Sequence, residues 1–234
     1  MSALVLAPRH FDHTLLRPEA TAAQVARTCR EAAAHGFAAA CVPPCHVAAA
    51  AALLAGTGVA VCTVVGFPLG YAAPAAKLAE AEVALADGAT ELDMVLNVSA
   101  LKSGLDAAVR ADVAALAARC HAAGALLKVI LETALLDEAE IARAALLCAA
   151  AGADFVKTST GFASRGASVE DVQLLRRVLP AHVRIKASGG IRTRAAALAL
   201  LAAGADRLGC SNSVALLLGD EDVENPAPGP AANY

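Results

Sequence analysis

The sequence predicts an α/β protein built as a single (β/α)8 barrel of the TIM type. Eight short apolar segments of strand length alternate along the chain with segments of helical character. Because the chain has 234 residues, each strand and helix pair takes about 29 residues, which suits a closed barrel of eight units. An open doubly wound sheet is the alternative fold, but it gives no reason for eight such units.

The strands are predicted from apolar runs that proline, glycine or charge brings to an end. Residues 59–65 are apolar almost throughout, which is typical of a parallel strand buried on both faces. Pro43 and Pro44 stop the second run, because proline cannot donate to a strand ladder. In chain order the predicted strands cover 11–16, 38–42, 59–65, 91–97, 126–132, a sixth that begins at 155 and carries Lys157, a seventh that begins at 183 and carries Lys186, and 207–210.

The helices are predicted where alanine-rich segments lie between a capping residue and a glycine. Thr21 suits the N-cap of the first helix, and Gly36 suits its C-terminal end. On the third helix we expect Lys77, Glu80 and Glu82 to face outward. In chain order the predicted helices cover 22–35, 47–54, 74–87, 105–123, 138–151, 169–179, 193–203 and a short apolar segment after residue 213.

The composition divides the chain into a catalytic barrel domain and a C-terminal tail. Residues 1–218 carry the alternating pattern, whereas 219–234 are acidic and rich in proline and glycine. A segment of that composition cannot bury enough apolar surface to fold, so we expect a flexible tail.

Charge and cysteine usage exclude several classes of protein. The net charge is −3, and no cluster of Lys and Arg with interleaved aromatics occurs, so no nucleic-acid partner is expected. The apolar runs are too short to span a membrane, and the first nine residues lack the basic leader of a signal peptide. The seven cysteines are odd in number and form no C-x-x-C pair, which predicts neither disulfides nor a metal site and fits a reducing cytoplasm.

Polar residues interrupt the apolar strands at positions that a barrel would bring together. In such barrels the active site lies at the carboxyl ends of the strands, so these side chains should converge there. They are Asp12, Thr63, Asp93, Lys128, Lys157 and Lys186.

Two of these lysines predict imine chemistry. Most lysines are solvated surface charges, but Lys157 follows an apolar strand and precedes a run of small residues, where a substrate could approach closely. A second ammonium from Lys186 should lower the pKa of its neighbour, because like charges disfavour one another. Asp93 could shuttle protons between them and a substrate, or it could serve only as their ion-pair partner.

Glycine and small polar residues predict a phosphate site beside these lysines. Gly189 and Gly190 follow the seventh strand, and Gly209 begins a run of small residues after the eighth, where barrels frequently bind phosphate. A glycine pair alone most often marks only a turn.

Six segments closely resemble the deoxyribose-phosphate aldolase family, and the likeness covers about residues 10–218. They are 12–16, 64–70, 91–95, 128–133, 155–161 and 186–192. The resemblance implies a cofactor-free class I aldolase of the cytoplasm that reversibly cleaves 2-deoxy-D-ribose 5-phosphate to D-glyceraldehyde 3-phosphate and acetaldehyde in deoxyribonucleoside catabolism. It also implies a homodimer whose partners are small phosphosugar and aldehyde substrates.

The resemblance assigns roles to individual residues. It implies that Lys157 forms the imine, that Lys186 lowers its pKa and that Asp93 relays protons. The implied phosphate contacts are Gly161, Gly189, Gly190, Ser211 and Asn212, and Asn212 stands where many members have serine.

Further residues are possible accessories to the reaction. Some members end in a tyrosine that assists proton transfer, and this chain ends in Tyr234, although that residue could equally be a terminus without a role. Cys41 ends a predicted strand, which makes it a candidate for modification. The other possible accessories are Asp12, Thr14 and Lys128.

Two other functions remain open at the level of the sequence. A barrel could use its lysine to hold pyridoxal phosphate, which would need a partner for the pyridine nitrogen and would give a yellow protein. A phosphosugar-binding barrel that has lost catalysis is the non-enzymatic alternative. Asp93, Lys157 and Lys186 are all present, so nothing in the sequence indicates such a loss.

Overall fold

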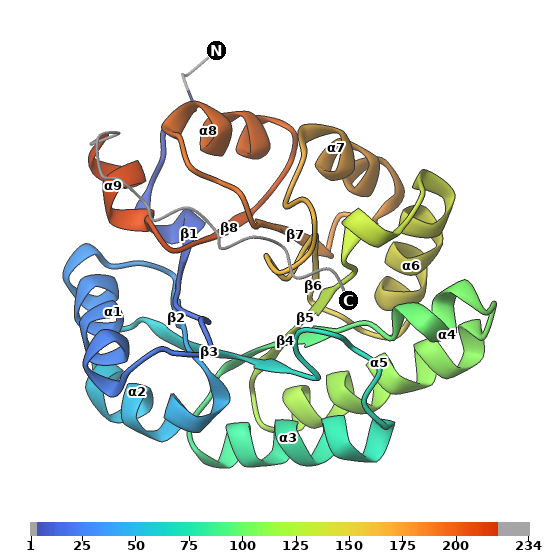
Figure 1. The fold of residues 1–234 in the computed structure, drawn as a ribbon, viewed down its shortest axis with the longest axis horizontal. Coiled ribbons are helices and arrows are strands. Elements are labelled where there is room, and N and C mark those ends of the chain that lie inside the picture. The colour runs from blue at the N-terminus through green and yellow to red at the C-terminus, as the bar shows by residue number, and fades with distance from the viewer. Residues whose placement is uncertain (1–3, 220–234) are drawn as a thin grey trace.

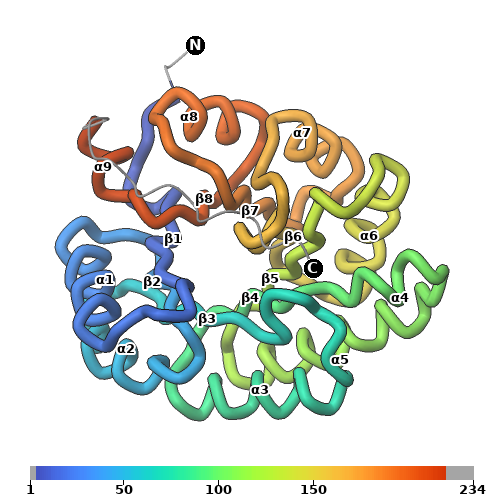
Figure 2. The backbone as a smooth tube through the Cα atoms, viewed as in Figure 1, coloured from blue at the N-terminus to red at the C-terminus, as the bar shows by residue number. Residues whose placement is uncertain are grey.

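The computed structural model describes residues 4–219 and confirms the predicted barrel (Figure 1). All neighbouring strands pair in parallel in chain order, and β8 pairs with β1 to close the ring (Figure 2). The strands are β1 Phe11–Thr14, β2 Ala39–Cys41, β3 Ala60–Val65, β4 Glu91–Val95, β5 Leu126–Ile130, β6 Phe155–Lys157, β7 Arg184–Ser188 and β8 Arg207–Cys210.

Helices surround the barrel and cover its outer face (Figure 1). They are α1 Ala22–His35, α2 Val47–Leu54, α3 Pro74–Ala86, α4 Val98–Lys102, α5 Asp106–Ala122, α6 Glu138–Ala150, α7 Val169–Val178, α8 Arg194–Ala202 and α9 Ser213–Leu218, with the short 3-10 helices η1 Pro8–His10, η2 Pro44–His46 and η3 Thr133–Leu135. The predicted cap holds, since the Thr21 hydroxyl accepts the Gln24 N–H, and Gly36 adopts the left-handed conformation. Among residues 4–219 no helix combines the length and apolar character needed to cross a bilayer.

Several strands end earlier than the apolar runs predict. Those predicted over 11–16 and 126–132 end at Thr14 and Ile130, because strands that pair around a narrow barrel share a register over only a few residues. The helix α4 was not predicted, because five residues carry no apolar period. The Asn97 side chain caps it by accepting the Ala100 N–H at 3.0 Å.

The prediction that Lys77 faces outward is wrong, whereas Glu80 and Glu82 are exposed as expected. Lys77 is fully buried between α3 and α5, where its Nζ donates to Asp112 Oδ2 at 2.7 Å and to the Val95 carbonyl at 2.9 Å. The neighbouring helix supplies the carboxylate, and a sequence pattern within α3 cannot reveal it.

The apolar core lies mainly between the strands and the helices. Inside the barrel a separate small cluster occupies one side and consists of Ala39, Cys41, Cys62 and Val64. The rest of the interior contains charged side chains instead of the branched aliphatic layers that usually fill such barrels. The candidate site consists of these charged side chains, which occupy positions that aliphatic side chains usually fill.

Candidate active site

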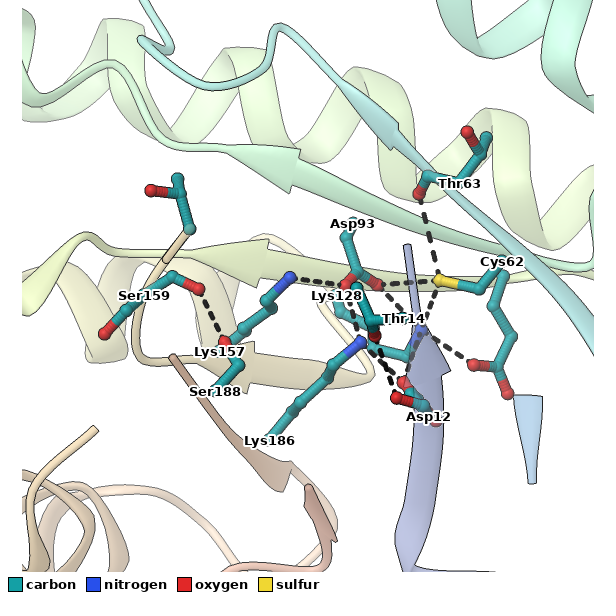
Figure 3. A network of polar contacts seen from close by, with 12 residues as sticks. Asp12, Thr14, Cys62, Thr63, Asp93, Lys128, Lys157, Ser159, Lys186 and Ser188 are labelled. Atoms are coloured by element: carbon teal, nitrogen blue, oxygen red, sulfur yellow. Dashed lines mark hydrogen bonds and ion pairs between the residues drawn. The ribbon is translucent and has the colours of Figure 1, made fainter. Parts of the chain in front are cut away.

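Asp93 is the centre of the site (Figure 3). Its Oδ2 accepts hydrogen bonds from Lys157 Nζ at 2.8 Å and from Lys186 Nζ at 2.7 Å, and its Oδ1 accepts from Lys128 Nζ at 2.7 Å. The strand register explains this convergence, because Lys157 pairs with Lys186 across β6 and β7, and Asp93 pairs with Lys128 across β4 and β5. Each pair therefore leaves its two strands at one height, and across β5 and β6 the two pairs are offset by two residues, since Lys128 pairs with Phe155.

A second layer of charge lies below Asp93, toward the amino ends of the strands. Asp12 Oδ2 binds Lys186 Nζ, and its Oδ1 accepts from the guanidinium of Arg207. Glu91 Oε2 lies 2.7 Å from Lys128 Nζ. We call these three carboxylates and four cations the charged cluster: Asp12, Glu91, Asp93, Lys128, Lys157, Lys186 and Arg207.

Burial and charge together set the protonation states in the charged cluster. Burial alone would raise the pKa of Asp93, but Lys128, Lys157 and Lys186 outweigh it and lower that pKa well below its ordinary value. Burial alone would lower the pKa of Lys186, but Asp12 and Asp93 raise it above the ordinary lysine value. Lys186 is thus held as a cation and Asp93 as an anion.

The charge balance of the cluster leaves one cation in surplus. Four cationic side chains face three carboxylates, so the cluster becomes neutral when one lysine is an uncharged amine. The pKa of Lys128 is raised, because Asp93, Cys62, Glu91 and Asp12 together outweigh the effect of its burial. Lys157 contacts only one carboxylate oxygen among the described residues and keeps 2% of its surface exposed, whereas Lys186 is fully buried.

The cluster also contains groups that have the right spacing for a metal ion. Ligand atoms of Cys41, Cys62 and Asp93 lie within 4.8 Å of one another, and so do those of Asp12, Cys62 and Glu91. Each of these carboxylates already binds a lysine or an arginine. A cation would have to displace those partners, so the donor set does not fit a resident metal.

The predicted glycine loops come together above the lysines. A Cβ added to Gly189 would lie 3.3 Å from the Cα of Gly161, and Gly161, Gly189 and Gly190 all have positive φ. Ser211 is exposed, and the Asn212 side-chain amide donates to the Arg192 carbonyl at 3.3 Å, which links the loops after β7 and β8. The loops after β6, β7 and β8 therefore lie together at the carboxyl-end rim of the barrel.

The sequence prediction for Thr63 is wrong, and Cys62 takes its place. Side chains alternate along β3, so Cys62 faces the interior, where its thiol donates to Asp93 Oδ1 at 3.3 Å. The Thr63 hydroxyl instead donates to the Val42 carbonyl at 2.8 Å. Successive side chains of a strand point to opposite faces, so a prediction that is off by one residue selects a side chain on the wrong face.

The other accessory residues lie in different settings. The Thr14 hydroxyl donates to the Asp12 carbonyl at 2.8 Å, next to the charged cluster. Cys41 does end β2, but its side chain is fully buried beside Cys62, so a reagent in solvent does not reach it in this conformation. Tyr234 and residues 220–234 of the predicted tail lie outside the described residues, and Gly219 caps the end of α9.

Three charged side chains of the site, and the space that Gly209 provides for Lys186, were not predicted from the sequence. Arg207 and Glu91 were not chosen because each stands at the start of a strand, although Glu91 shares a strand face with Asp93 two residues later. Gly209 was read only as part of a phosphate loop. A Cβ there would lie 2.9 Å from Lys186 Cε, so glycine makes room for the lysine.

Glu132 is the third of these charged side chains. It is the one non-glycine residue with positive φ between residues 4 and 219, at φ 57°, and it lies two residues after the end of β5 at Ile130. Its buried Oε2 accepts from the Thr160 N–H at 3.2 Å and also binds the Thr160 hydroxyl, which anchors the loop that leads from Lys157 to Gly161. Strained backbone of this kind persists only where the surroundings hold it, often at functional sites.

Comparisons with known proteins agree with this geometry. A family model described as DeoC/LacD family aldolase matches residues 7–212. The chain is 51% identical to a deoxyribose-phosphate aldolase of Brevibacillus brevis over 90% of this chain and 95% of that protein, and 52% identical to one of Rhodospirillum rubrum over 94% and 92%.

Solved structures give the same picture. A putative deoxyribose-phosphate aldolase from Coccidioides immitis superposes with a TM-score of 0.87 at 43% identity, covering 91% of this chain and 85% of that one. A deoxyribose phosphate aldolase from Aeropyrum pernix, described as a tetramer, gives a TM-score of 0.84 at 38% identity and covers 92% and 91% of the two chains.

Proposed function

The chain belongs to the DeoC/LacD family of aldolases, and on this premise we propose that it cleaves 2-deoxy-D-ribose 5-phosphate reversibly to D-glyceraldehyde 3-phosphate and acetaldehyde. The protein is a carbon–carbon lyase. One observation carries the assignment of its site: Lys157 Nζ and Lys186 Nζ each lie within 2.8 Å of the same oxygen of Asp93 in a buried setting.

The contacts of the two lysines support different roles for them. Lys186 lies between Asp12 and Asp93, which keep it protonated, so it serves as the fixed positive charge. Lys157 ends its strand with a single carboxylate contact and is the amine that a carbonyl compound can reach. Imine formation needs a lysine in its uncharged amine form, because that form is the nucleophile.

The reaction follows from these roles. Lys157 Nζ attacks the C1 aldehyde of the open-chain sugar, and loss of water gives the imine. The proton of the C3 hydroxyl passes to a base, the C2–C3 bond breaks, and its electron pair moves through the new C1–C2 double bond onto the imine nitrogen. D-glyceraldehyde 3-phosphate leaves, C2 of the enamine takes up a proton, and water releases acetaldehyde and free Lys157.

Asp93 and Lys186 serve the proton transfers. Asp93 is ionised, because three lysines lower its pKa, and its Oδ2 therefore orients Lys157 and Lys186 and can pass a proton between them or to water. Lys157 Nζ and Lys186 Nζ both donate to Asp93 Oδ2, so a proton can pass between the two nitrogens through one shared oxygen. This arrangement supports Asp93 as a relay as well as an ion-pair partner.

The substrate phosphate is assigned to the glycine loops. We place it at the backbone of Gly161, Gly189 and Gly190, beside Ser211 and Asn212, because these loops lie together at the carboxyl ends of β6, β7 and β8, where barrels frequently bind phosphate. The Asn212 amide that binds Arg192 then fixes the β8 loop against the β7 loop.

Reductive trapping tests the proposal directly. Borohydride with acetaldehyde should add one ethyl group to the protein and inactivate it, and peptide mass spectrometry should locate the group on Lys157. Lys157→Ala should abolish both trapping and turnover, while dialysis against a chelator should leave turnover unchanged. An unmodified Lys157, or an ethyl group on Lys186 instead, would reject the role of Lys157.

We also propose a homodimer in the cytoplasm that acts in deoxyribonucleoside catabolism. All seven cysteines are free thiols, which suits a reducing compartment. The Aeropyrum pernix relative is described as a tetramer, so light scattering on the purified protein should decide between the two states.

A further inference from the structure

A cavity lies on the side of the barrel where the strands begin, away from the carboxyl-end rim that the glycine loops form. Its volume is about 300 Å³, and it lies between η1 and the first residues of β6, β7 and β8. Phe155, Arg184 and Arg207 begin these strands, whereas Lys157 and Lys186 lie two residues farther along β6 and β7. Arg207 lines the cavity, and Asp12 lies between Arg207 and Lys186 of the proposed aldolase site.

Three arginines, Arg9, Arg184 and Arg207, line the cavity. The Arg184 guanidinium stacks 3.9 Å above the ring of Phe155, and neither Arg184 nor the exposed Arg9 forms an ion pair within residues 4–219. Arg207 lies on the same wall. The wall carries one carboxylate, that of Asp206, and its Oδ2 already accepts the Ile185 N–H at 2.8 Å.

The imidazole of His10 also lines the cavity and supplies a hydrogen-bond donor. Its Nδ1 accepts the Ala7 N–H at 3.1 Å, so Nε2 carries the hydrogen in the neutral ring. Burial, with the charges of Arg9 and Arg207, lowers the pKa of His10, so the ring is neutral near pH 7. Leu201 and Ala205 form an apolar side of the same space.

We propose that this cavity is a binding site for a phosphate monoester, whose anionic head contacts Arg9, Arg184 and Arg207 and whose organic part lies against Leu201 and Ala205. Guanidinium groups bind phosphate through paired, charge-assisted hydrogen bonds. The volume is at the lower end of the range of ordinary ligand pockets, which suits a ligand the size of a sugar phosphate.

The occupant of this cavity is coupled to the lysines through ion pairs. Arg207 binds Asp12, Asp12 binds Lys186, and Lys186 shares Asp93 with Lys157. An anion beside Arg207 neutralises part of its charge, so Asp12 attracts Lys186 more strongly and weakens the hold of Lys186 on Asp93. The cavity is thereby a regulatory site for the chemistry at the other end of the barrel.

Equilibrium dialysis with radiolabelled inorganic phosphate tests binding, whatever the aldolase site itself contributes. Arg184→Gln should bind one phosphate fewer per chain than the wild type, and Arg9→Gln should weaken that site about tenfold. Arg30→Gln, which removes an exposed arginine on α1, should match the wild type. Phenyl phosphate should bind this site more tightly than phosphate does. Equal stoichiometry and affinity in the wild type, Arg184→Gln and Arg9→Gln would overturn the proposal.

The kinetic consequence rests on the proposed aldolase activity and is measured separately. At saturating substrate, phosphate that competes in the aldolase site has no effect on kcat, so a change in kcat reports the second site. The ratio of kcat with and without phosphate should differ from one in the wild type and Arg30→Gln and should return to one in Arg184→Gln. A ratio of one in the wild type despite binding at the second site would overturn the coupling through Arg207.

Discussion

Replacing Asp93 by asparagine is the sharpest perturbation of the charged cluster. Asparagine has the size of aspartate but lacks its charge, and it replaces one acceptor oxygen by an NH₂ donor. Asp93 accepts from three lysines at 2.7 to 2.8 Å, and ammonium groups can only donate. The asparagine NH₂ must therefore oppose either Lys128 alone or both Lys157 and Lys186, and we expect it to turn toward Lys128.

The magnitude follows from burial. Asp93 is fully buried, and removing one partner of a buried ion pair costs about 3–5 kcal/mol because the remaining charge is left without compensation. The surplus of positive charge in the cluster rises by one, so an additional lysine is driven to lose its proton. Loss of a positioned proton relay lowers a rate by about 10²–10⁴. We therefore expect Asp93→Asn to lose 3–5 kcal/mol of unfolding free energy, about the full range for such pairs, and at least about 100-fold in kcat.

Asp112→Asn is the matched control in the same chain. Asp112 accepts from the buried Lys77 Nζ at 2.7 Å, so this change also breaks a buried ion pair, but between α3 and α5 and away from the barrel interior. Urea denaturation should give similar losses of unfolding free energy for the two variants. A coupled assay of D-glyceraldehyde 3-phosphate release should find kcat reduced only in Asp93→Asn. Equal kcat values for the two variants would refute the assignment of Asp93 to the reaction.

The remaining predictions concern the second lysine, acid stability and the strained residue after β5. Lys186→Met should lower kcat about 100-fold or more while borohydride trapping with acetaldehyde still modifies Lys157; if trapping moved or stopped, Lys157 would not be an independent nucleophile. The pKa values of Asp12 and Asp93 are lowered in the folded state, so their stabilisation is complete above the unfolded pKa of about 3.9 and is lost as the pH falls below it. The thermal midpoint should thus be nearly constant from about pH 5 to 7 and drop steeply below about pH 4, and Asp93→Asn should flatten that drop, as calorimetry can measure. Glu132→Gly should be more stable than Glu132→Ala by about 1 kcal/mol in urea denaturation, because only glycine adopts positive φ without strain; equal stabilities would mean that φ at this position is not costly.

Local patterns in the sequence were sufficient for the architecture of this protein. Apolar runs, the cap at Thr21 and the terminating Gly36 depend on residues within a few positions of one another, so they can be recognised without a three-dimensional structure. Lys157, Lys186 and Asp93 could be singled out for the same reason, since each is a charged residue within a short apolar strand.

The partners of these residues were decided only by closure of the barrel. Asp93 and Lys186 are 93 positions apart in the chain, and Arg207 and Asp12 are 195 positions apart, yet both pairs are in contact. The strand register and the joining of β8 to β1 set those contacts, and no local period encodes them. The burial of Lys77 against Asp112 was unpredictable for the same reason, because the carboxylate comes from another helix.

The sequence by itself therefore determined the eight-fold alternation and the types of residue at the strand ends, because both are local properties of the chain. The tertiary structure alone decided that buried carboxylates raise the pKa of both Lys128 and Lys186, that Cys62 instead of Thr63 faces the interior, and that Arg207 both lines a cavity and binds Asp12, the partner of Lys186. Electrostatic interactions depend on distance in space and on burial, and both are fixed only when the ring of strands closes.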